Sequence, residues 1–194
     1  FEKKVADDYN FRFQKYGAQP KSSLWFSEKR QIFRFDLIIK CIKTEPMPSR
    51  FSINDIGCGY GGFLKRLQSS FRNQQFSYCG YDLAQNLVSY CQNSYSEKDG
   101  HFYCSGDPFR KADYSVMSGT FNYAPEISVN EWEEYLFAKL NSIWNSTNNS
   151  MIFNLMVSEQ TKITPQSISY IEKEAVFNFC QNNLGRTLQY VSSE

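Results

Sequence analysis

A glycine-rich turn between a strand-like segment and an amphipathic segment constrains this chain more than any other feature. Residues 51–56, with Phe51, Ile53 and Ile56, have the character of a strand, and Gly57, Gly59 and Gly62 follow at the spacing G-x-G-x-x-G. Glycines at this spacing let the backbone bend sharply and let a ligand approach the main chain closely. Apolar residues recur at helical spacing over residues 64–71. The segment therefore predicts a strand, a tight turn and a helix.

Apolar segments of strand length alternate with longer amphipathic segments from about residue 51 onward. This alternation predicts an α/β domain with a mainly parallel sheet. The expected strands are Phe51–Ile56, Phe76–Tyr81, His101–Cys104, Tyr114–Ser118, Met151–Met156 and Thr187–Val191. The expected helices that follow the first strand are Gly62–Phe71, Ala84–Tyr95, Val129–Trp144 and Ile171–Gln181. Ser128 and Glu131 predict a capping box before the third of these helices, and the polar run 145–149 predicts a turn before the fifth strand.

The segment before the first expected strand has a different organisation. Two helices are expected there, Lys4–Lys15 and Ser27–Ile42, separated by a glycine and a proline that interrupt the helical pattern. We therefore expect a helical N-terminal cap over residues 1–45. Residues 46–194 are expected to form the main domain, and the two parts together one compact unit.

The composition argues against several classes of function. The 194 residues carry 21 Lys and Arg against 20 Asp and Glu, so no strong positive field favours binding to nucleic acid or to a membrane surface. The six Cys stand singly beside one His, which is the pattern of neither a zinc site nor a disulfide framework. We expect free thiols and no metal. No stretch approaches the roughly 20 apolar residues of a membrane span, and no signal peptide is recognised, so a cytoplasmic location is expected.

Two carboxylates near the glycine turn discriminate between the cofactors that such a turn can hold. Asp82 ends the second expected strand about 20 residues after the turn, where a carboxylate can accept hydrogen bonds from a ribose diol. Asp55 lies just before the first glycine and would place negative charge beside the pyrophosphate of a dinucleotide. S-adenosylmethionine (SAM) carries a sulfonium and an ammonium group instead. The two acids therefore favour SAM over NAD, and an NAD-dependent oxidoreductase remains the alternative.

At these residues the sequence resembles the class I SAM-dependent methyltransferases, over about residues 50–157. The run Asp55-Ile56-Gly57-Cys58-Gly59-Tyr60-Gly61 is similar to the first motif of that family, and Asp82 is similar to its ribose-binding acid. The resemblance implies a Rossmann-like three-layer sandwich with SAM as the methyl donor and S-adenosylhomocysteine (SAH) as the product. It also implies a C-terminal hairpin, which we expect to be missing from this chain.

The same resemblance implies further contacts with the cofactor. Asp107 and Pro108 follow the third expected strand, where the family places an acid and an apolar residue against the adenine, and Phe109 is a weaker candidate for packing on the ring. Arg34 is the first candidate for binding the methionine carboxylate and Lys21 the second; the alternative for Arg34 is a side chain that extends from an amphipathic helix into solvent. The implied cofactor-binding set is Asp55, Gly57, Cys58, Gly59, Asp82, Leu83, Asp107, Pro108, Ser118 and Arg34.

Methyl transfer from a sulfonium is an in-line displacement, so the protein mainly has to align the acceptor and exclude water. Asn122 and Tyr123 follow the fourth expected strand, where the resemblance implies the acceptor site, and Asn154 is a third candidate. A polar loop with a packed aromatic residue is the alternative interpretation of this segment. The Asn-Pro-Pro-Tyr type of motif found in base-methylating members is absent from residues 118–125, which favours a small-molecule acceptor methylated on oxygen or nitrogen. A non-catalytic Rossmann-like binding protein is a further alternative, and the oligomeric state is left open.

Overall fold

The computed structural model describes residues 1–25, 27–44 and 49–187. Its central sheet has five strands in the order β3-β2-β1-β4-β5, and the neighbouring strands pair in parallel. The strands are β1 (Arg50–Ile56), β2 (Gln75–Asp82), β3 (His101–Cys104), β4 (Ala112–Ser118) and β5 (Thr147–Asn154). β1 lies at the centre with β2 and β4 on either side, so the carboxyl ends of these three strands meet at one edge of the sheet.

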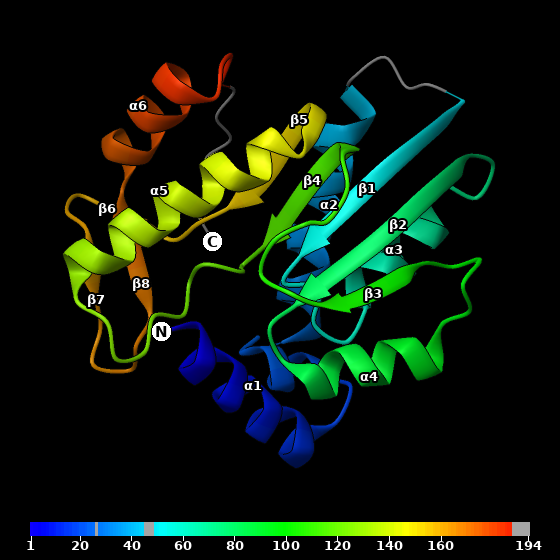
Figure 1. Cartoon of the computed structure of the whole chain (residues 1–194), viewed down its shortest axis with the longest axis horizontal. Coiled ribbons are helices and arrows are strands. Elements are labelled where there is room, and N and C mark those ends of the chain that lie inside the picture. The colour runs from blue at the N-terminus through cyan, green and yellow to red at the C-terminus, as the bar shows by residue number, and fades with distance from the viewer. Residues whose placement is uncertain (26, 45–48, 188–194) are drawn as a thin grey trace.

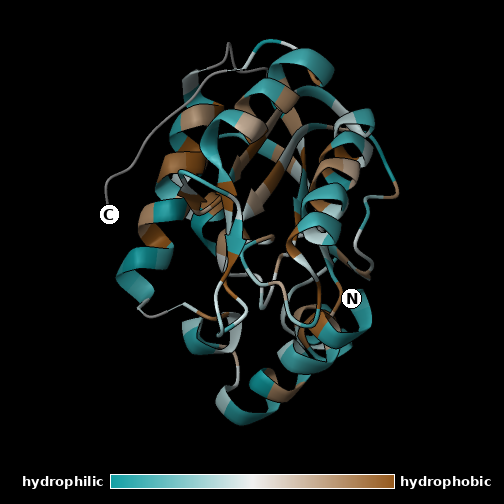
Figure 2. Cartoon of the chain, turned by 90° about the vertical axis from the view of Figure 1, so that its left-hand side faces the viewer, coloured by the Kyte–Doolittle hydropathy of each residue, from teal (hydrophilic) through white to brown (hydrophobic). Residues whose placement is uncertain are grey.

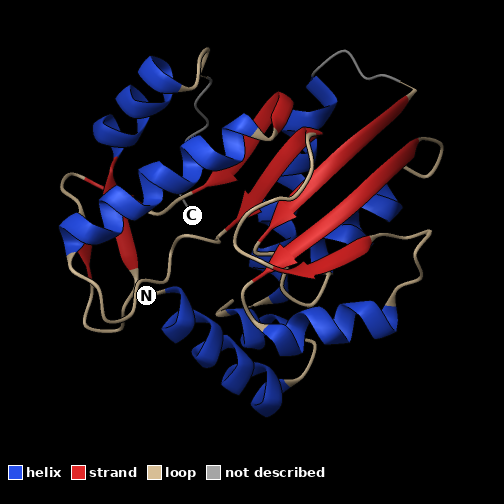
Figure 3. Cartoon of the chain, in the orientation of Figure 1, coloured by secondary structure: helices blue, strands red, loops and turns tan. Residues whose placement is uncertain are grey.

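Helices cover both faces of this sheet, which makes three layers (Figure 1, Figure 3). The helices that the structure describes are α1 (Glu2–Tyr16), α2 (Glu28–Thr44), α3 (Gly62–Ser70), α4 (Gln85–Ser94), α5 (Val129–Asn145) and α6 (Lys173–Asn183), with a short 3-10 helix η1 (Pro20–Ser23). The core on one face contains Phe35 of α2, Leu67 of α3 and Val88 of α4. The core on the other face contains Leu136 of α5 and Cys180 of α6. Hydrophilic residues predominate on the outer sides of the helices (Figure 2). The predicted α/β fold with a mainly parallel sheet is therefore confirmed.

The start of α5 confirms the capping box that its sequence predicts. The Glu131 backbone N–H donates to Ser128 Oγ at 3.3 Å, and the Ser128 backbone N–H donates to Glu131 Oε2 at 3.1 Å. Two backbone donors that the helix itself leaves without partners are thereby satisfied. α5 starts at this point and carries Trp132 and Leu136 onto the sheet.

Most expected boundaries are displaced by one or two residues, and two of the differences change the assignment of a segment. The polar run expected as a turn is partly in β5, which begins at Thr147 opposite Ala112. β5 tolerates these polar side chains because it lies at an edge of the described sheet and because Thr147 Oγ1 donates to Ser115 Oγ at 2.7 Å. The helix expected from Ile171 begins two residues later, since Ile171 belongs to strand β8 (Ser169–Glu172).

β8 is part of a small second sheet that the sequence did not predict. It pairs in parallel with β6 (Val157–Ser158) and in antiparallel with β7 (Lys162–Ile163). Strands of two residues leave no period-2 pattern to detect. The expected strand Thr187–Val191 and any hairpin beyond it lie outside the described residues, apart from Thr187.

The N-terminal segment contributes both to the core and to the edge where the strands end. α2 joins the apolar core through Phe35 and Ile42, whereas α1 lies beyond the carboxyl ends of the strands (Figure 1). The division into a cap and a main domain stays a prediction. All six cysteines are described and none of them forms a disulfide. Within the described part of the chain, no helix combines the length and the apolarity needed to cross a membrane.

Candidate functional site

A cavity of about 380 Å³ lies at the carboxyl ends of the central strands, a size typical of small-molecule sites. The ends of β1, β2, β4 and β5 line it through Asp55, Asp82, Ser118 and Asn154. α1, α2 and the segment between them supply much of the remaining wall. The parallel sheet therefore brings together side chains that are far apart in the sequence.

The glycine turn presents main chain, not side chains, to this cavity. Gly57 and Gly59 both line it, with φ angles of +75° and +57° that side-chain-bearing residues rarely adopt. A Cβ on Gly57 would come within 2.6 Å of the Thr120 side chain, and one on Gly59 within 3.1 Å of Ser23 Oγ. The N–H groups of Gly57 and Cys58 donate to the Tyr81 carbonyl at 2.7 and 3.0 Å, which fixes the turn against β2. The turn is thus a rigid cradle with no room for added side chains.

Asp82 is held rigidly at the end of β2. Its Oδ2 accepts from the Gly59 N–H and its Oδ1 from the Ala84 N–H, each at 2.9 Å. The carboxyl group lies deep in the protein, although part of the side chain stays accessible through the cavity. Burial raises the pKa of Asp82, and the backbone hydrogen bonds from Ala84 and Gly59 oppose that rise. Each carboxylate oxygen has a further lone pair, so Asp82 can accept hydrogen bonds from a ligand diol.

Asp55 lies beneath the turn with 2% of its surface exposed, and it also lines the cavity. The Tyr78 hydroxyl donates to Asp55 Oδ2 at 2.5 Å. Burial raises the pKa of Asp55 to about 7, the Tyr78 hydrogen bond opposes this, and the charge of Asp82 adds to it. The negative charge of Asp55 is therefore costly in the protein alone, and a cation in the cavity would stabilise it.

Three buried polar atoms in the cavity wall have no hydrogen-bond partner among the described residues. They are Ser23 Oγ, Ser118 Oγ and Trp132 Nε1. Buried polar atoms are nearly always hydrogen-bonded, so their convergence on one cavity indicates a polar ligand. Ser118 was predicted from the sequence, whereas Ser23 and Trp132 were not. Both belong to segments remote from the glycine turn, and no local motif marks them.

The other predicted cofactor residues divide into two groups. Cys58, Leu83 and Arg34 line the cavity. The residues that line the cavity do not include Lys21, Asp107, Pro108 or Phe109, and after β3 the wall consists of Ser105 and Gly106. The Asp107 carboxylate instead accepts from Lys139 Nζ of α5 at 2.6 Å, and the Phe109 ring is 68% exposed. A long-range ion pair thus directs Asp107 toward α5, whereas the resemblance led us to expect it against the adenine.

The three candidates for the acceptor side, Asn122, Tyr123 and Asn154, all line the cavity. Asn122 Oδ1 accepts from the Met156 N–H at 3.0 Å, and its Nδ2 has no acceptor among the described residues. The Tyr123 hydroxyl donates to Asp8 Oδ2 of α1 at 2.7 Å. Burial and the hydrogen bond to Asp8 raise the pKa of Tyr123 to about 12, so its phenol is protonated at neutral pH.

Comparison with known proteins relates the sequence and the fold of this chain to methyltransferases. No family model matches the sequence. A protein of Mycobacterium tuberculosis with a provisional methyltransferase name is 29% identical over 141 residues, which are 71% of this chain and 83% of that protein. A SAM-dependent methyltransferase from Leishmania major superposes with a TM-score of 0.72 at 10% identity, covering 95% of this chain and 74% of its own. A mycolic acid cyclopropane synthase complexed with SAH and CTAB superposes with a TM-score of 0.61 at 14% identity. This match covers 93% of the present chain and 71% of the synthase chain.

These similarities confirm the resemblance that the glycine motif carries. The fold is that of the SAM-dependent methyltransferases, and the sequence similarity points to the same class of enzyme.

Proposed function

We propose that this protein, with the fold of the class I SAM-dependent methyltransferases, transfers the methyl group of SAM to oxygen or nitrogen of a small-molecule acceptor. The observation that carries the proposal is that three features converge on one cavity: the glycine cradle, the carboxylate of Asp82 and a set of unpartnered buried polar atoms. When bound, SAM supplies a methyl group on a sulfonium, whose thioether is a good leaving group.

The cavity residues fit the chemical groups of this cofactor. Asp82 has acceptor capacity for the ribose diol, and the main chain at Gly57 and Gly59, which lines the cavity, is the proposed contact of the methionine part. The carboxylate of Asp55 favours the positively charged groups. Arg34 is the proposed partner of the methionine carboxylate. Ser105 and Gly106, with Leu83 nearby, replace Asp107 as the proposed contacts of the adenine.

The other end of the cavity supports a small acceptor. Trp25, Met156 and Tyr170 line it with aromatic and apolar surface, and the Asn122 amide offers a donor that can orient an oxygen or nitrogen acceptor. Such walls exclude water and hold the acceptor in line with the transferred group.

Tyr123 and Asp8 are the proposed route for the proton of a hydroxyl acceptor. The Tyr123 hydroxyl already donates to Asp8 Oδ2, so a proton received on the Tyr123 oxygen is accompanied by transfer of the phenolic proton to Asp8. Lys4 Nζ lies 2.5 Å from Asp8 Oδ1. Asp8 and Tyr123 also border a second, smaller surface depression, where Asp8 can return the proton to solvent.

Calorimetric titration with SAM, SAH and NAD tests the cofactor assignment. We expect SAM and SAH to bind and NAD not to bind. Asp82→Ala should weaken SAH by about tenfold or more, the scale of a lost charge-assisted hydrogen bond, while the exposed control Glu97→Ala binds as the wild type does. Unchanged SAH affinity in Asp82→Ala, or preferential binding of NAD, would overturn the assignment.

Methyl transfer itself is tested by SAH formation with a panel of hydroxylated and amino-substituted small molecules. An acceptor found in this way should be methylated at least tenfold more slowly by Tyr123→Phe, with unchanged affinity for SAH, because the proton route is lost. SAM binding with no turnover on any acceptor would favour the non-catalytic alternative.

A further inference from the structure

α1 forms one wall of the cavity with little apolar anchorage of its own. Phe1, Val5 and Tyr9 line the cavity, yet Val5 is the one buried residue in the fifteen of this helix. A helix with so small a buried face is held in place by individual contacts more than by a core. Beside the ring contacts that Phe1, Tyr9 and Phe13 make, the polar contacts of α1 therefore contribute to how firmly this wall is closed.

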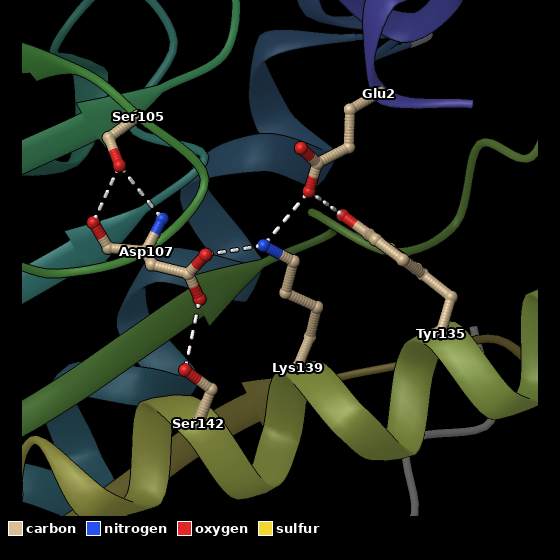
Figure 4. A network of polar contacts seen from close by, with 6 residues as sticks. All are labelled: Glu2, Ser105, Asp107, Tyr135, Lys139 and Ser142. Carbon is tan, nitrogen blue, oxygen red and sulfur yellow. Dashed lines mark hydrogen bonds and ion pairs between the residues drawn. The ribbon is translucent and has the colours of Figure 1, made fainter.

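One group of these contacts converges on Lys139, in the middle of α5 (Figure 4). Lys139 Nζ lies 2.9 Å from Glu2 Oε1 of α1 and 2.6 Å from Asp107 Oδ2 in the segment after β3. The Tyr135 hydroxyl donates to the same Glu2 oxygen at 2.9 Å, and Ser142 Oγ donates to Asp107 Oδ1 at 3.1 Å. One lysine thus joins the start of α1 to the segment between β3 and β4.

That segment is itself part of the cavity wall. Ser105 and Gly106 line the cavity, and Ser105 Oγ accepts from the Asp107 N–H at 3.1 Å and donates to the Asp107 carbonyl at 2.8 Å. A Cβ on Gly106 would lie 3.2 Å from Glu2 Oε1 and 3.3 Å from Lys139 Nζ. The ion pairs therefore pack directly on the wall, and a shift of Asp107 is transmitted to its neighbours.

The charges make Lys139 the indispensable member of this network. Its side chain is 14% exposed, whereas those of Glu2 and Asp107 are 41% and 45% exposed. Burial lowers the pKa of Lys139, but the hydrogen bonds to Asp107 and Glu2 outweigh it and leave the pKa raised, so the amine stays charged. Without that charge, two carboxylates would face each other with no cation between them, and α1 would be repelled from the segment after β3.

We propose that Lys139 is a positioning residue that holds α1 and residues 105–107 closed over the bound cofactor product and thereby slows its release. The proposal rests on the proposed function, because SAH is the ligand that is retained. Asp107, which the family resemblance placed against the adenine, acts in this arrangement through Lys139, without touching the ligand.

Stopped-flow fluorescence and calorimetry with SAH test this role in the intact chain. We expect Lys139→Gln to raise both the dissociation rate and the Kd by about tenfold, with an association rate within about twofold of wild type. Lys139→Arg, which keeps the charge, should restore both to within about threefold, and the exposed control Lys40→Gln should behave as wild type. Raising the salt concentration should increase the wild-type Kd and leave that of Lys139→Gln nearly unchanged.

A wild-type dissociation rate in Lys139→Gln, or equal losses in the Gln and Arg variants, would overturn the proposal. If Lys139→Gln does not fold, Tyr135→Phe replaces it. This variant removes one hydrogen bond to Glu2 and keeps the lysine, so the dissociation rate should rise about threefold, and no rise refutes the closing role. Failure of the wild-type protein to bind SAH refutes the proposed function instead, which separates the two outcomes.

Discussion

Asp55 gives the sharpest prediction, because its burial links protein stability to pH in an unusual direction. The carboxyl group is almost fully buried, with Tyr78 as its hydrogen-bond donor and with Asp82 as a nearby negative charge. Its pKa is raised from an ordinary value of 3.8 to about 7. The perturbation is Asp55→Asn, which keeps the shape and an oxygen that can accept from the Tyr78 hydroxyl, and removes the ionisable group.

The sign and the size of the effect follow from proton binding. Between about pH 4 and pH 7 the folded protein holds a proton on Asp55 that the unfolded chain has lost, so stability falls as the pH rises through this range. Above pH 7 the full cost of the buried charge is present. At about 1.4 kcal/mol for each pH unit, the pKa difference corresponds to on the order of 4 kcal/mol.

Urea denaturation of wild type and Asp55→Asn at pH 5, 6, 7 and 8 measures this pH-dependent part of the free energy of unfolding. The free energy of unfolding of the variant minus that of wild type should grow with pH up to about 7 and then become constant. The difference cancels carboxylates such as Asp99, whose pKa is lowered by hydrogen bonds from Ser96 and which titrates in both proteins. A difference that does not vary with pH would refute the idea that Asp55 is neutral in the folded protein at low pH.

The ionisation of Asp55 should also make cofactor binding depend on pH, but with the opposite sign: a higher pH lowers the stability of the protein and raises its affinity for SAM. A sulfonium near Asp55 favours its ionised form, so the affinity of wild type for SAM should rise from pH 6 to pH 8. SAH lacks the sulfonium charge and provides a matched control, with a weaker dependence on pH. The difference between the two ligands should disappear in Asp55→Asn.

Three further substitutions have outcomes that the structure fixes. Ser118→Ala should leave the unfolding free energy of the ligand-free protein unchanged and weaken SAH about threefold or more, because Ser118 Oγ has no protein partner; a loss of stability would argue against this. Gly57→Ala should cost more than Gly17→Ala, by about 1–3 kcal/mol in denaturation, since both have positive φ but only the first meets another side chain, that of Thr120; equal costs would contradict it. Ser128→Ala should lower stability by about 1 kcal/mol through loss of the helix cap, and an unchanged denaturation midpoint would show that the cap contributes nothing.

Features that depend on residues close together in the sequence could be predicted from it. The glycine turn and the capping box at Ser128 each depend on residues a few positions apart, and both form as expected. The direction of the Asp107 side chain could not be predicted in this way. Its direction is set by Lys139 and Ser142, more than thirty residues along the chain, and nothing adjacent to Asp107 indicates that α5 will present a lysine there.

Side-chain positions could therefore be predicted from the sequence better at the proposed cofactor end of the cavity than at the proposed acceptor end. The proposed cofactor end is formed by the glycine turn after β1 and by Asp82 at the end of β2, and each of these features can be recognised in a short stretch of sequence. The Gly59 N–H donates to Asp82 Oδ2 there at 2.9 Å. The proposed acceptor end depends on the small sheet, where Tyr170 lines the cavity from β8, a strand whose sheet partners are two residues long and which is also anchored by the buried Ile171 and by hydrogen bonds from Ser169 to Phe121 and Asn122. Side chains on such an element gain their positions from tertiary contacts, so under the proposed function a change of acceptor should require substitutions around Tyr170 and Asn122, while the proposed cofactor cradle stays the same.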